Sequence, residues 1–281
     1  MDYTGVGILL ALISSVTTAS AHALLKAGKD KLAVRAIIGA VGTIALAPAC
    51  LFVPIPTPGL VPWLLTASVL HTTYQLVLIR AYEANDFAVA FPVARGIAPI
   101  ATAVLGVTLL GDHLTLGGLV GVGLVSAGIL MIATDRTIAA SGLIAAGIAG
   151  LLTTAYAFVD AHAIRLAPFA MTFVAWFFFL DGIIMFPIFA ILRGGQVASL
   201  MRSEGRQGLL AGVTSLVSFG AALTALRLAP VGIVSALRET SVIFGMMIAA
   251  FVPREDVGRR RVAAAAVIVT GAILILATAA S

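Results

Sequence analysis

Two arginines, Arg95 and Arg238, each lie in the middle of a long apolar stretch, and their separation is close to half of the chain length. A charge at the centre of a membrane span costs roughly 2.5–3.5 kcal/mol on insertion scales, so such a residue usually faces a cavity or a partner. A guanidinium is always charged and offers a planar set of donors that suits carboxylate or phosphate. The two arginines are therefore predicted to bind an anionic group of a small-molecule substrate.

An internal ion pair is the alternative explanation. Glu239 follows Arg238, and Asp181 lies inside another apolar stretch, so either carboxylate could neutralise the arginines. The two explanations are compatible, since Glu239 could hold Arg238 and leave Arg95 free. Because burial disfavours the charged form of a carboxyl group, Asp181 and Glu239 are candidates for balancing charge or for carrying a proton.

Further polar side chains share faces of expected helices. His71, Tyr74 and Gln75 fall at positions i, i+3 and i+4, and Tyr156 and Asp160 have the same spacing as His71 and Gln75. We expect His71, Tyr74, Gln75 and Tyr156 to supply hydrogen bonds to the substrate, and Asp160 to balance charge or couple protons. Hydrogen bonding between helices is the alternative.

Other charged and polar residues have simpler expected roles. Thr18, His22 and Lys26 form a polar line along the first apolar stretch. Lys26 and Arg165 are expected to extend towards the lipid headgroups. His113 is expected to be a solvated loop residue.

Composition identifies the class of protein. Hydrophobic residues make up 61% of the chain and charged residues only 10%, with a mean hydropathy of +1.13. A soluble domain carries about 25% charged residues, and about twenty apolar residues cross a bilayer as a helix. The sequence predicts an all-α integral membrane protein with ten transmembrane helices, at about 5–25, 33–53, 60–82, 87–110, 114–133, 139–162, 168–192, 208–228, 230–252 and 261–279.

The separation of Arg95 from Arg238 recurs between Asp112 and Glu255 and between Gly128 and Gly271. The chain is therefore predicted to contain one five-helix unit twice, in residues 1–137 and 138–281. An odd number of spans makes the second unit enter the membrane from the opposite side, which gives two inverted five-helix repeats. Secondary transporters often have this arrangement, with the substrate near the bilayer midplane.

Basic residues predict the orientation. The loops after odd-numbered spans hold thirteen of the 17 lysines and arginines, while the opposite loops hold Arg165 and Arg227. The positive-inside rule places both termini outside the cell. The same distribution explains the net charge of +5 without nucleic acid. The thirteen are Lys26, Lys29, Lys31, Arg35, Arg80, Arg136, Arg193, Arg202, Arg206, Arg254, Arg259, Arg260 and Arg261.

The sequence contains no zinc-helix, nucleophile-elbow or phosphate-loop motif, so we expect no enzyme activity, no cofactor and no metal. The single cysteine, Cys50, is expected to be a small apolar residue of the second span. Gly117 and Gly121 predict close helix packing, either within the chain or with a second copy. The protein is therefore expected to be a monomer or a homodimer.

Several motifs resemble the EamA branch of the drug/metabolite transporter superfamily across essentially the whole chain. Residues 81–96 and 109–115 are similar to the family's fourth-helix signature and the acidic turn that follows, and residues 237–241 with Glu255 resemble the matching elements of the second half. Tyr156, Asp160 and Arg165 also have spacings similar to a subgroup of the family. Related proteins often carry histidine and tryptophan-asparagine where this chain has Thr18, Ala21 and His22.

The resemblance implies two EamA-like repeats in the inner membrane. We expect a multi-pass secondary transporter that moves a small polar or amphipathic metabolite by alternating access, and export of amino-acid-like compounds is what the resemblance most often implies. The expected pocket is lined by the third, fourth, eighth and ninth spans with parts of the first and sixth. The alternative is a membrane-embedded enzyme or lipid-handling protein acting on a lipid-linked substrate.

Overall fold

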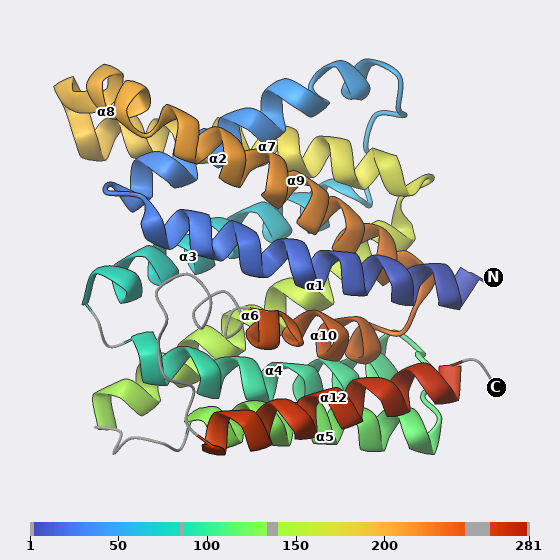
Figure 1. Cartoon of the computed structure of the whole chain (residues 1–281). Helices are drawn as coiled ribbons and strands as arrows, with labels where there is room; N and C mark the ends of the chain where they lie inside the picture. Colours follow the sequence, from blue (N-terminus) through green and yellow to red (C-terminus); the bar gives the residue numbers. More distant parts are fainter. Residues whose placement is uncertain (1–2, 85–86, 134–139, 245–258, 280–281) are drawn as a thin grey trace.

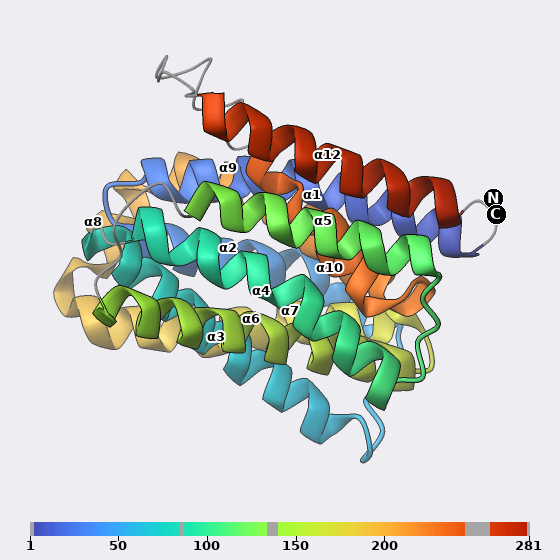
Figure 2. The same cartoon turned by 90° about the horizontal axis from the view of Figure 1, so that it is seen from below.

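The computed structural model describes residues 3–84, 87–133, 140–244 and 259–279, and every element in these ranges is helical. The long helices lie side by side, and both termini lie at the same end of the bundle (Figures 1 and 2). The elements are α1 (Tyr3–Ala27), α2 (Lys31–Leu46), η1 (Pro48–Leu51), α3 (Val61–Ala84), α4 (Phe87–Leu109), α5 (Leu116–Ala133), α6 (Ala140–Leu166), α7 (Ala170–Arg193), η2 (Gly194–Gln196), α8 (Val197–Ser203), α9 (Gly205–Leu228), α10 (Val231–Glu239) and α12 (Arg259–Ala279).

Each of the ten predicted spans coincides with helix over most of the part that the structure describes. Within the described ranges, four helical segments are long and apolar enough to cross a membrane by length and composition: Thr4–Ala27, Lys31–Leu51, Ala170–Ser203 and Gly205–Leu228. Large apolar side chains such as Leu9, Ile44, Ile191 and Ile273 point outwards and are exposed. In a bilayer, this apolar surface faces lipid instead of water.

Pro92, Gly96 and Pro99 are expected from the sequence to loosen the backbone around Arg95, because each proline removes a helical hydrogen bond. This expectation is corrected, since α4 is one continuous helix. The interruption lies in the ninth span, where α10 ends at Glu239 and Thr240 forms a turn before helix resumes at 241–244. Residues 245–252 of that span, and Glu255, lie outside the described residues.

The turn at Thr240 satisfies its polar groups locally. Its hydroxyl donates to the Leu237 carbonyl at 2.6 Å and lies 2.7 Å from the Ser15 hydroxyl of α1. The Ile243 amide then donates to the Thr240 carbonyl at 2.9 Å. Unsatisfied backbone groups are costly in a bilayer, so these bonds allow a helix to end at membrane depth.

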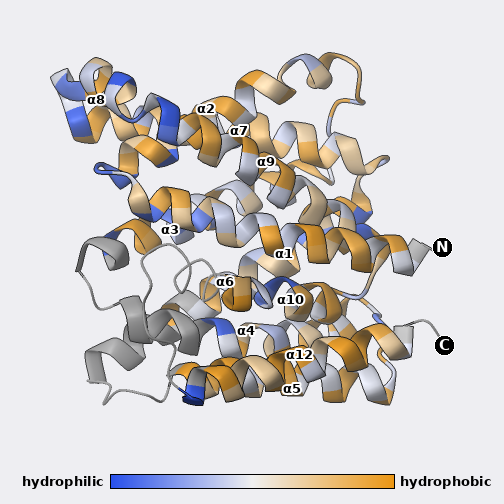
Figure 3. Cartoon of the chain, in the orientation of Figure 1, coloured by the Kyte–Doolittle hydropathy of each residue, from blue (hydrophilic) through white to orange (hydrophobic). Residues whose placement is uncertain are grey.

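Charged residues fix the end of the bundle that lies opposite the termini. Asp30 caps α2 by accepting from the Ala33 amide at 2.8 Å, and it also accepts from Arg193 Nε at 2.8 Å. The Gln207 side chain donates to the Leu24 carbonyl at 2.8 Å. The loop between α1 and α2 is thereby tied to the end of α7 and the start of α9. Hydrophilic ribbon gathers at this end, around α8 and the start of α2, whereas the helix middles are largely hydrophobic (Figure 3).

Helices of the first half pack mainly on helices of the second half. α1 lies on α9, α2 on α7, α4 on α6, and α5 on α12. Two of these contacts depend on glycine. At Gly39 of α2, an added Cβ would lie 3.1 Å from the Gly182 Cα of α7, and at Gly182 it would lie 2.5 Å from the Gly39 carbonyl oxygen and collide with the Thr43 hydroxyl.

The contact between α5 and α12 confirms that the glycines of the fifth span let another helix approach closely, and the partner is in the same chain (Figure 2). A Cβ at Gly121 would lie 2.6 Å from Ile275 Cγ1 and 2.8 Å from the Gly271 carbonyl oxygen. A Cβ at Gly128 would lie 2.9 Å from the Ala264 carbonyl oxygen. The two carbonyl oxygens belong to the backbone, which has little freedom to move.

We predict that Gly121→Ala lowers the free energy of unfolding by about 1–3 kcal/mol, because the added methyl overpacks the seam between α5 and α12. Thermal unfolding of the purified protein in detergent measures the effect. Gly123→Ala on the same helix is the matched control, since a Cβ there meets no described atom within 4 Å. Equal melting temperatures for the two variants would contradict this account of the seam.

Candidate functional site

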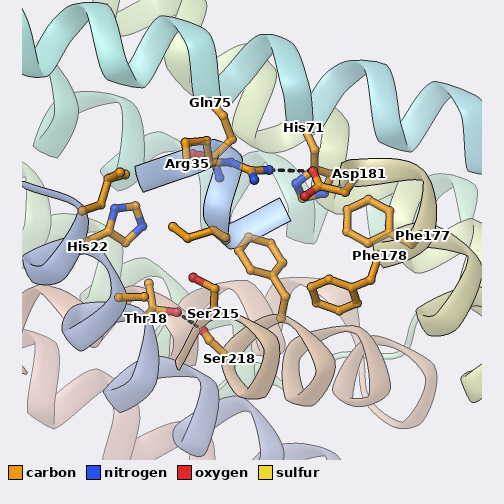
Figure 4. A pocket seen from close by; sticks show the side chains of 14 residues that line it. Thr18, His22, Arg35, His71, Gln75, Phe177, Phe178, Asp181, Ser215 and Ser218 are labelled. Atoms are coloured by element: carbon orange, nitrogen blue, oxygen red, sulfur yellow. Dashed lines mark hydrogen bonds and ion pairs between the residues drawn. The ribbon is translucent and has the colours of Figure 1, made fainter. Parts of the chain in front are cut away.

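A polar cavity lies among α1, α2, α3, α7 and α9, and so is formed by both halves of the chain (Figure 4). Its lining combines charged, hydroxyl and aromatic side chains: Thr18, Ala21, His22, Leu25, Arg35, Ile38, His71, Gln75, Phe177, Phe178, Asp181, Ser215, Ser218 and Phe219. The cavity volume open to water is about 40 Å³, which is room for a few water molecules. Entry of a metabolite therefore requires the surrounding helices to separate.

The charged wall of the cavity is an ion pair between α2 and α7. Arg35 Nη2 donates to Asp181 Oδ1 at 2.6 Å, and both side chains are nearly inaccessible, at 5% and 6% exposure. This corrects two expectations. Arg35 is an interior residue and does not belong to the loops, and Asp181 neutralises Arg35 instead of Arg95 or Arg238.

The third-span residues all lie in the interior. His71 and Gln75 line the cavity, and Tyr74 is buried beside it, with its ring 5.2 Å from that of Tyr156. His71 Nε2 lies 2.7 Å from Asp160 Oδ2, and its ring is 4.4 Å from the Tyr156 ring. The structure thus brings His71, Tyr74, Tyr156 and Asp160 together in one buried cluster that joins α3 to α6.

A series of hydroxyl groups leads from the cavity to Arg238. Thr18 Oγ1 lies 2.6 Å from Ser218 Oγ, which lies 3.4 Å from Ser14 Oγ. Arg238 Nε donates to Ser14 Oγ at 3.1 Å, and its guanidinium carbon sits 5.2 Å from the centre of the Phe219 ring. Arg238 is therefore behind the cavity wall and reaches it through Ser14, Ser218 and Phe219.

Arg95 is neutralised by Glu239. Arg95 Nε lies 3.3 Å from Glu239 Oε2, and Arg95 Nη1 donates to the Ser241 hydroxyl at 3.3 Å. The expectation that Glu239 holds Arg238 and leaves Arg95 free is corrected by this contact. Among the residues whose side chains the structure describes, neither Arg95 nor Arg238 lines this cavity, and its wall comes from α1, α2, α3, α7 and α9 instead of the expected fourth, sixth and ninth spans.

Printed contacts connect Arg238 and the aromatic cluster with the cavity. Arg238 reaches it through the hydroxyl groups of Ser14 and Ser218, and Ser218 lines it. Tyr156 packs against His71, which also lines the cavity. Arg238, the cavity and the cluster of His71 with Asp160 therefore form one continuous polar interior.

The ends of α6 and α9 near the termini are also joined by charged groups. Asp112 accepts from Arg165 Nη1 at 2.7 Å and Nη2 at 3.3 Å, and from the Val231 amide at 2.7 Å at the start of α10. Arg165 also donates to the Leu226 carbonyl at 3.0 Å. Arg165 is thus a structural residue, contrary to the expectation that it extends to the headgroups. Exposed Lys26 agrees with that expectation.

Sequence reasoning missed Arg35, although it lies within the predicted second span, and it also missed Ser14, Ser215 and Ser218. Cys50 lies in η1, beyond the end of α2, and is partly exposed. In the described ranges, no group of three or more histidine, cysteine, aspartate or glutamate side chains could hold a metal ion.

We predict that Asp112→Asn destabilises the protein, because an amide group cannot accept all three hydrogen bonds that the carboxylate accepts. A buried donor left without an acceptor costs about 1–3 kcal/mol. A lower melting temperature in detergent would show this, with exposed His113→Asn as the neighbouring control. An unchanged melting temperature for Asp112→Asn would mean that these bonds do not stabilise the end of the bundle.

Comparisons with known proteins agree with this architecture. One crystal structure of a protein superposes with a TM-score of 0.74 over 98% of each chain, at 18% sequence identity, which is a likeness of fold alone. No curated protein matches the sequence. Residues 5–134 and 140–277 each match the EamA-like transporter family, so two repeats of this family account for nearly the whole chain. The chain therefore belongs to the EamA-like transporter family and is a multi-pass membrane transporter of the drug/metabolite superfamily.

Proposed function

We propose that the protein is a secondary transporter that moves a small polar or amphipathic metabolite across the inner membrane by alternating access. The observation that carries this proposal is the buried, charged cavity between helices of the two halves. Burying charge in a membrane is costly, and such residues usually mark a solute pathway. The narrowness of the cavity agrees with a conformation in which the helices have closed around that pathway.

Contacts between the halves support an inverted repeat. With the spacing that separates Arg95 from Arg238, Gly121 corresponds to Ala264 and Gly128 to Gly271. A twofold relation then requires the contact of Gly121 with Gly271 to be matched by one between Gly128 and Ala264. An added Cβ at Gly271 would lie 2.7 Å from the Gly121 carbonyl oxygen, and one at Gly128 would lie 2.9 Å from the Ala264 carbonyl oxygen, as this relation requires.

The direction of the helices supports the same relation. α12 ends beside the C-terminus, at the end of the bundle where α5 begins, so these corresponding helices run antiparallel (Figure 2). A twofold axis that exchanges two antiparallel neighbouring helices is perpendicular to both of them. For helices that cross a membrane, such an axis lies in the membrane plane. Inverted-topology repeats of secondary transporters are related in this way.

For the orientation, we propose that both termini lie outside the cell. Without Arg35, twelve of the thirteen basic residues remain on the predicted inner face. Lys26, Lys29, Arg193 and Arg202 lie around the loops at the end opposite the termini (Figure 1). The excess of positive charge there favours a cytoplasmic location.

We propose that the solute contacts side chains of the continuous interior as the helices separate. His71, Gln75 and the neighbouring tyrosines Tyr74 and Tyr156 would supply hydrogen bonds. Asp160, Asp181 and Glu239 would balance charge or carry protons, since each neighbours a basic side chain. The family resemblance favours export, with amino-acid-like or anionic compounds as candidates.

We predict that Ser215→Trp abolishes transport, because an indole ring at this cavity-lining position fills the pathway. Proteoliposomes loaded with a mixture of amino acids, organic acids and phosphonates are assayed for loss of each compound by mass spectrometry. Val213→Trp is the matched control, because Val213 lies two residues away on α9 and is 51% exposed on the outer surface. This variant should retain transport. Absence of flux of every compound through the wild type, or equal flux through both variants, would contradict the proposal.

We also predict that Arg95→Ala and Arg238→Ala abolish transport while the protein stays folded, because the solute meets these arginines as the helices separate. Flux in the same proteoliposomes is compared with thermal unfolding, which reports any loss of structure. Glu239→Gln serves as a check on the ion pair, because it removes the charge that neutralises Arg95. Normal flux in both arginine variants would remove the two residues from the pathway.

A further inference from the structure

Arg35 is a buried guanidinium whose hydrogen bonding is incomplete. Its side chain is 5% exposed, and Nη2 donates to Asp181 Oδ1. Among the described residues, Nε and Nη1 have no hydrogen-bond acceptor. These two nitrogens carry three of the five N–H groups of an arginine. A buried donor without an acceptor costs free energy, so the arrangement favours an additional acceptor that the protein itself does not supply.

The position of Arg35 directs these donors towards the cavity. Arg35 is one of the residues that line the cavity (Figure 4). Arg95 and Arg238 are not among the described lining residues. A Cβ added at Gly39 would lie 3.4 Å from Arg35 Nη1 and 3.4 Å from Asp181 Oδ2. Nη1 therefore lies beside the backbone contact of α2 with α7. An acceptor from outside the protein can approach the guanidinium through the cavity that Arg35 lines.

The contact between Arg35 and Asp181 is a single hydrogen bond and does not use both oxygens of the carboxylate. A pair built only for stability gains most from two parallel bonds between the guanidinium and the carboxylate. The single bond keeps the site neutral when it is empty, because Asp181 balances the buried positive charge. The remaining donors can then bind two or three oxygens of a ligand without separating Arg35 from Asp181.

Aromatic side chains form another part of the same cavity. Phe177 and Phe178 of α7 and Phe219 of α9 line it together with Leu25 and Ile38. Their apolar surface stabilises an apolar group of a ligand. A ligand that satisfies both parts of the cavity has one acidic end and an apolar body.

We propose that Arg35 is the anion-binding residue of the cavity and that the transported solute is a small amphipathic oxyanion. Its carboxylate or phosphonate group accepts hydrogen bonds from Arg35 Nε and Nη1, and its apolar body lies against the three phenylalanines. Asp181 positions the guanidinium and balances its charge before the solute arrives. This assignment rests on the proposed transport function and specifies the chemistry of the solute.

Three probes with the same phenyl ring test the assignment: benzoate, phenylphosphonate and the neutral benzamide. Their affinities for the full-length purified protein in detergent are measured by isothermal titration calorimetry. We expect one or both anions to bind at least about tenfold more tightly than benzamide, because charge-assisted hydrogen bonds are stronger than neutral ones. The comparison of benzoate with phenylphosphonate shows which acidic group the site prefers. Equal binding of all three probes, or no binding of either anion, would overturn the proposal.

Substitutions separate an anion site from a purely structural ion pair. Arg35→Gln should weaken binding of the preferred anion at least about tenfold and leave benzamide unchanged. Asp181→Asn should strengthen anion binding, because it removes the negative charge that competes for Arg35. Exposed Arg202→Gln on α8 is the control and should have no effect. A structural pair would instead make both cavity variants bind more weakly.

Arg35→Lys covers the case in which Arg35→Gln does not fold. Lysine keeps the charge but lacks the planar set of donors, so Arg35→Lys should bind the preferred anion more weakly than the wild type does. Where Arg35→Gln folds, the affinity of Arg35→Lys should lie between those of the wild type and Arg35→Gln. Wild-type affinity in Arg35→Lys would contradict binding through Nε and Nη1. Undiminished anion preference in folded Arg35→Gln would reject the role of Arg35 while the transporter function stands. Absence of flux through wild-type proteoliposomes would reject the transporter function, whatever the binding data show.

Discussion

The burial of charge in pairs that join the two halves is the constraint on which this structure depends. Four ion pairs in the described part of the chain each link a residue before 137 to one after it: Arg35 with Asp181, Arg95 with Glu239, Asp112 with Arg165, and Asp30 with Arg193. The contact of His71 with Asp160 joins the halves in the same way. An unpaired charge at membrane depth is far more costly than a paired one. The halves therefore cannot part without new partners for these groups, and a charged solute, a proton or water is the available kind of partner.

The pairs differ in exposure, and this difference divides the molecule into a centre and two ends. Arg35, Asp181, His71 and Asp160 are nearly inaccessible, whereas Arg165 and Arg193 keep 24% and 29% of their side chains exposed. Water screens the outer pairs and lowers the cost of breaking them. Water does not screen the central pairs in this way, so breaking them costs more free energy than breaking the outer pairs. The helices around the cavity are therefore held together more strongly than the two ends of the bundle.

The helices and the duplication were predictable from the sequence because both depend on local composition and spacing. Apolar stretches of about twenty residues mark spans regardless of their neighbours, and the recurring separation shared by Arg95 and Arg238 requires no structure. The glycine seam was predictable in kind, since Gly117 and Gly121 are typical of close helix contacts. The break in the ninth span was not, because no proline lies near Thr240, whereas Pro92 and Pro99 are accommodated within α4.

The choice of charge partners could not be predicted, because it is set by which helices pack together. From the sequence, Asp181 could pair with any interior arginine. In the structure α2 packs on α7, and this places Asp181 next to Arg35. Arg35 itself was assigned to the loops because it stands near the start of a span, among other basic residues. A usable signal was present, since Gly39 and Gly182 have the same separation as Arg95 and Arg238 and indicate that α2 and α7 correspond.

The crossing of Gly39 over Gly182 has a mechanical consequence. Two helices that touch through backbone at one point, each near the middle of its length, can tilt about that point, so that one pair of helix ends approaches as the other pair separates. Gly39 lies about eight residues from either end of α2, or about 12 Å at 1.5 Å per residue, so a turn of about 20° displaces the ends by about 4 Å in opposite senses. Widening on one side of the bundle is then coupled to narrowing on the other, with the Arg35–Asp181 contact near the fulcrum, where displacement is smallest.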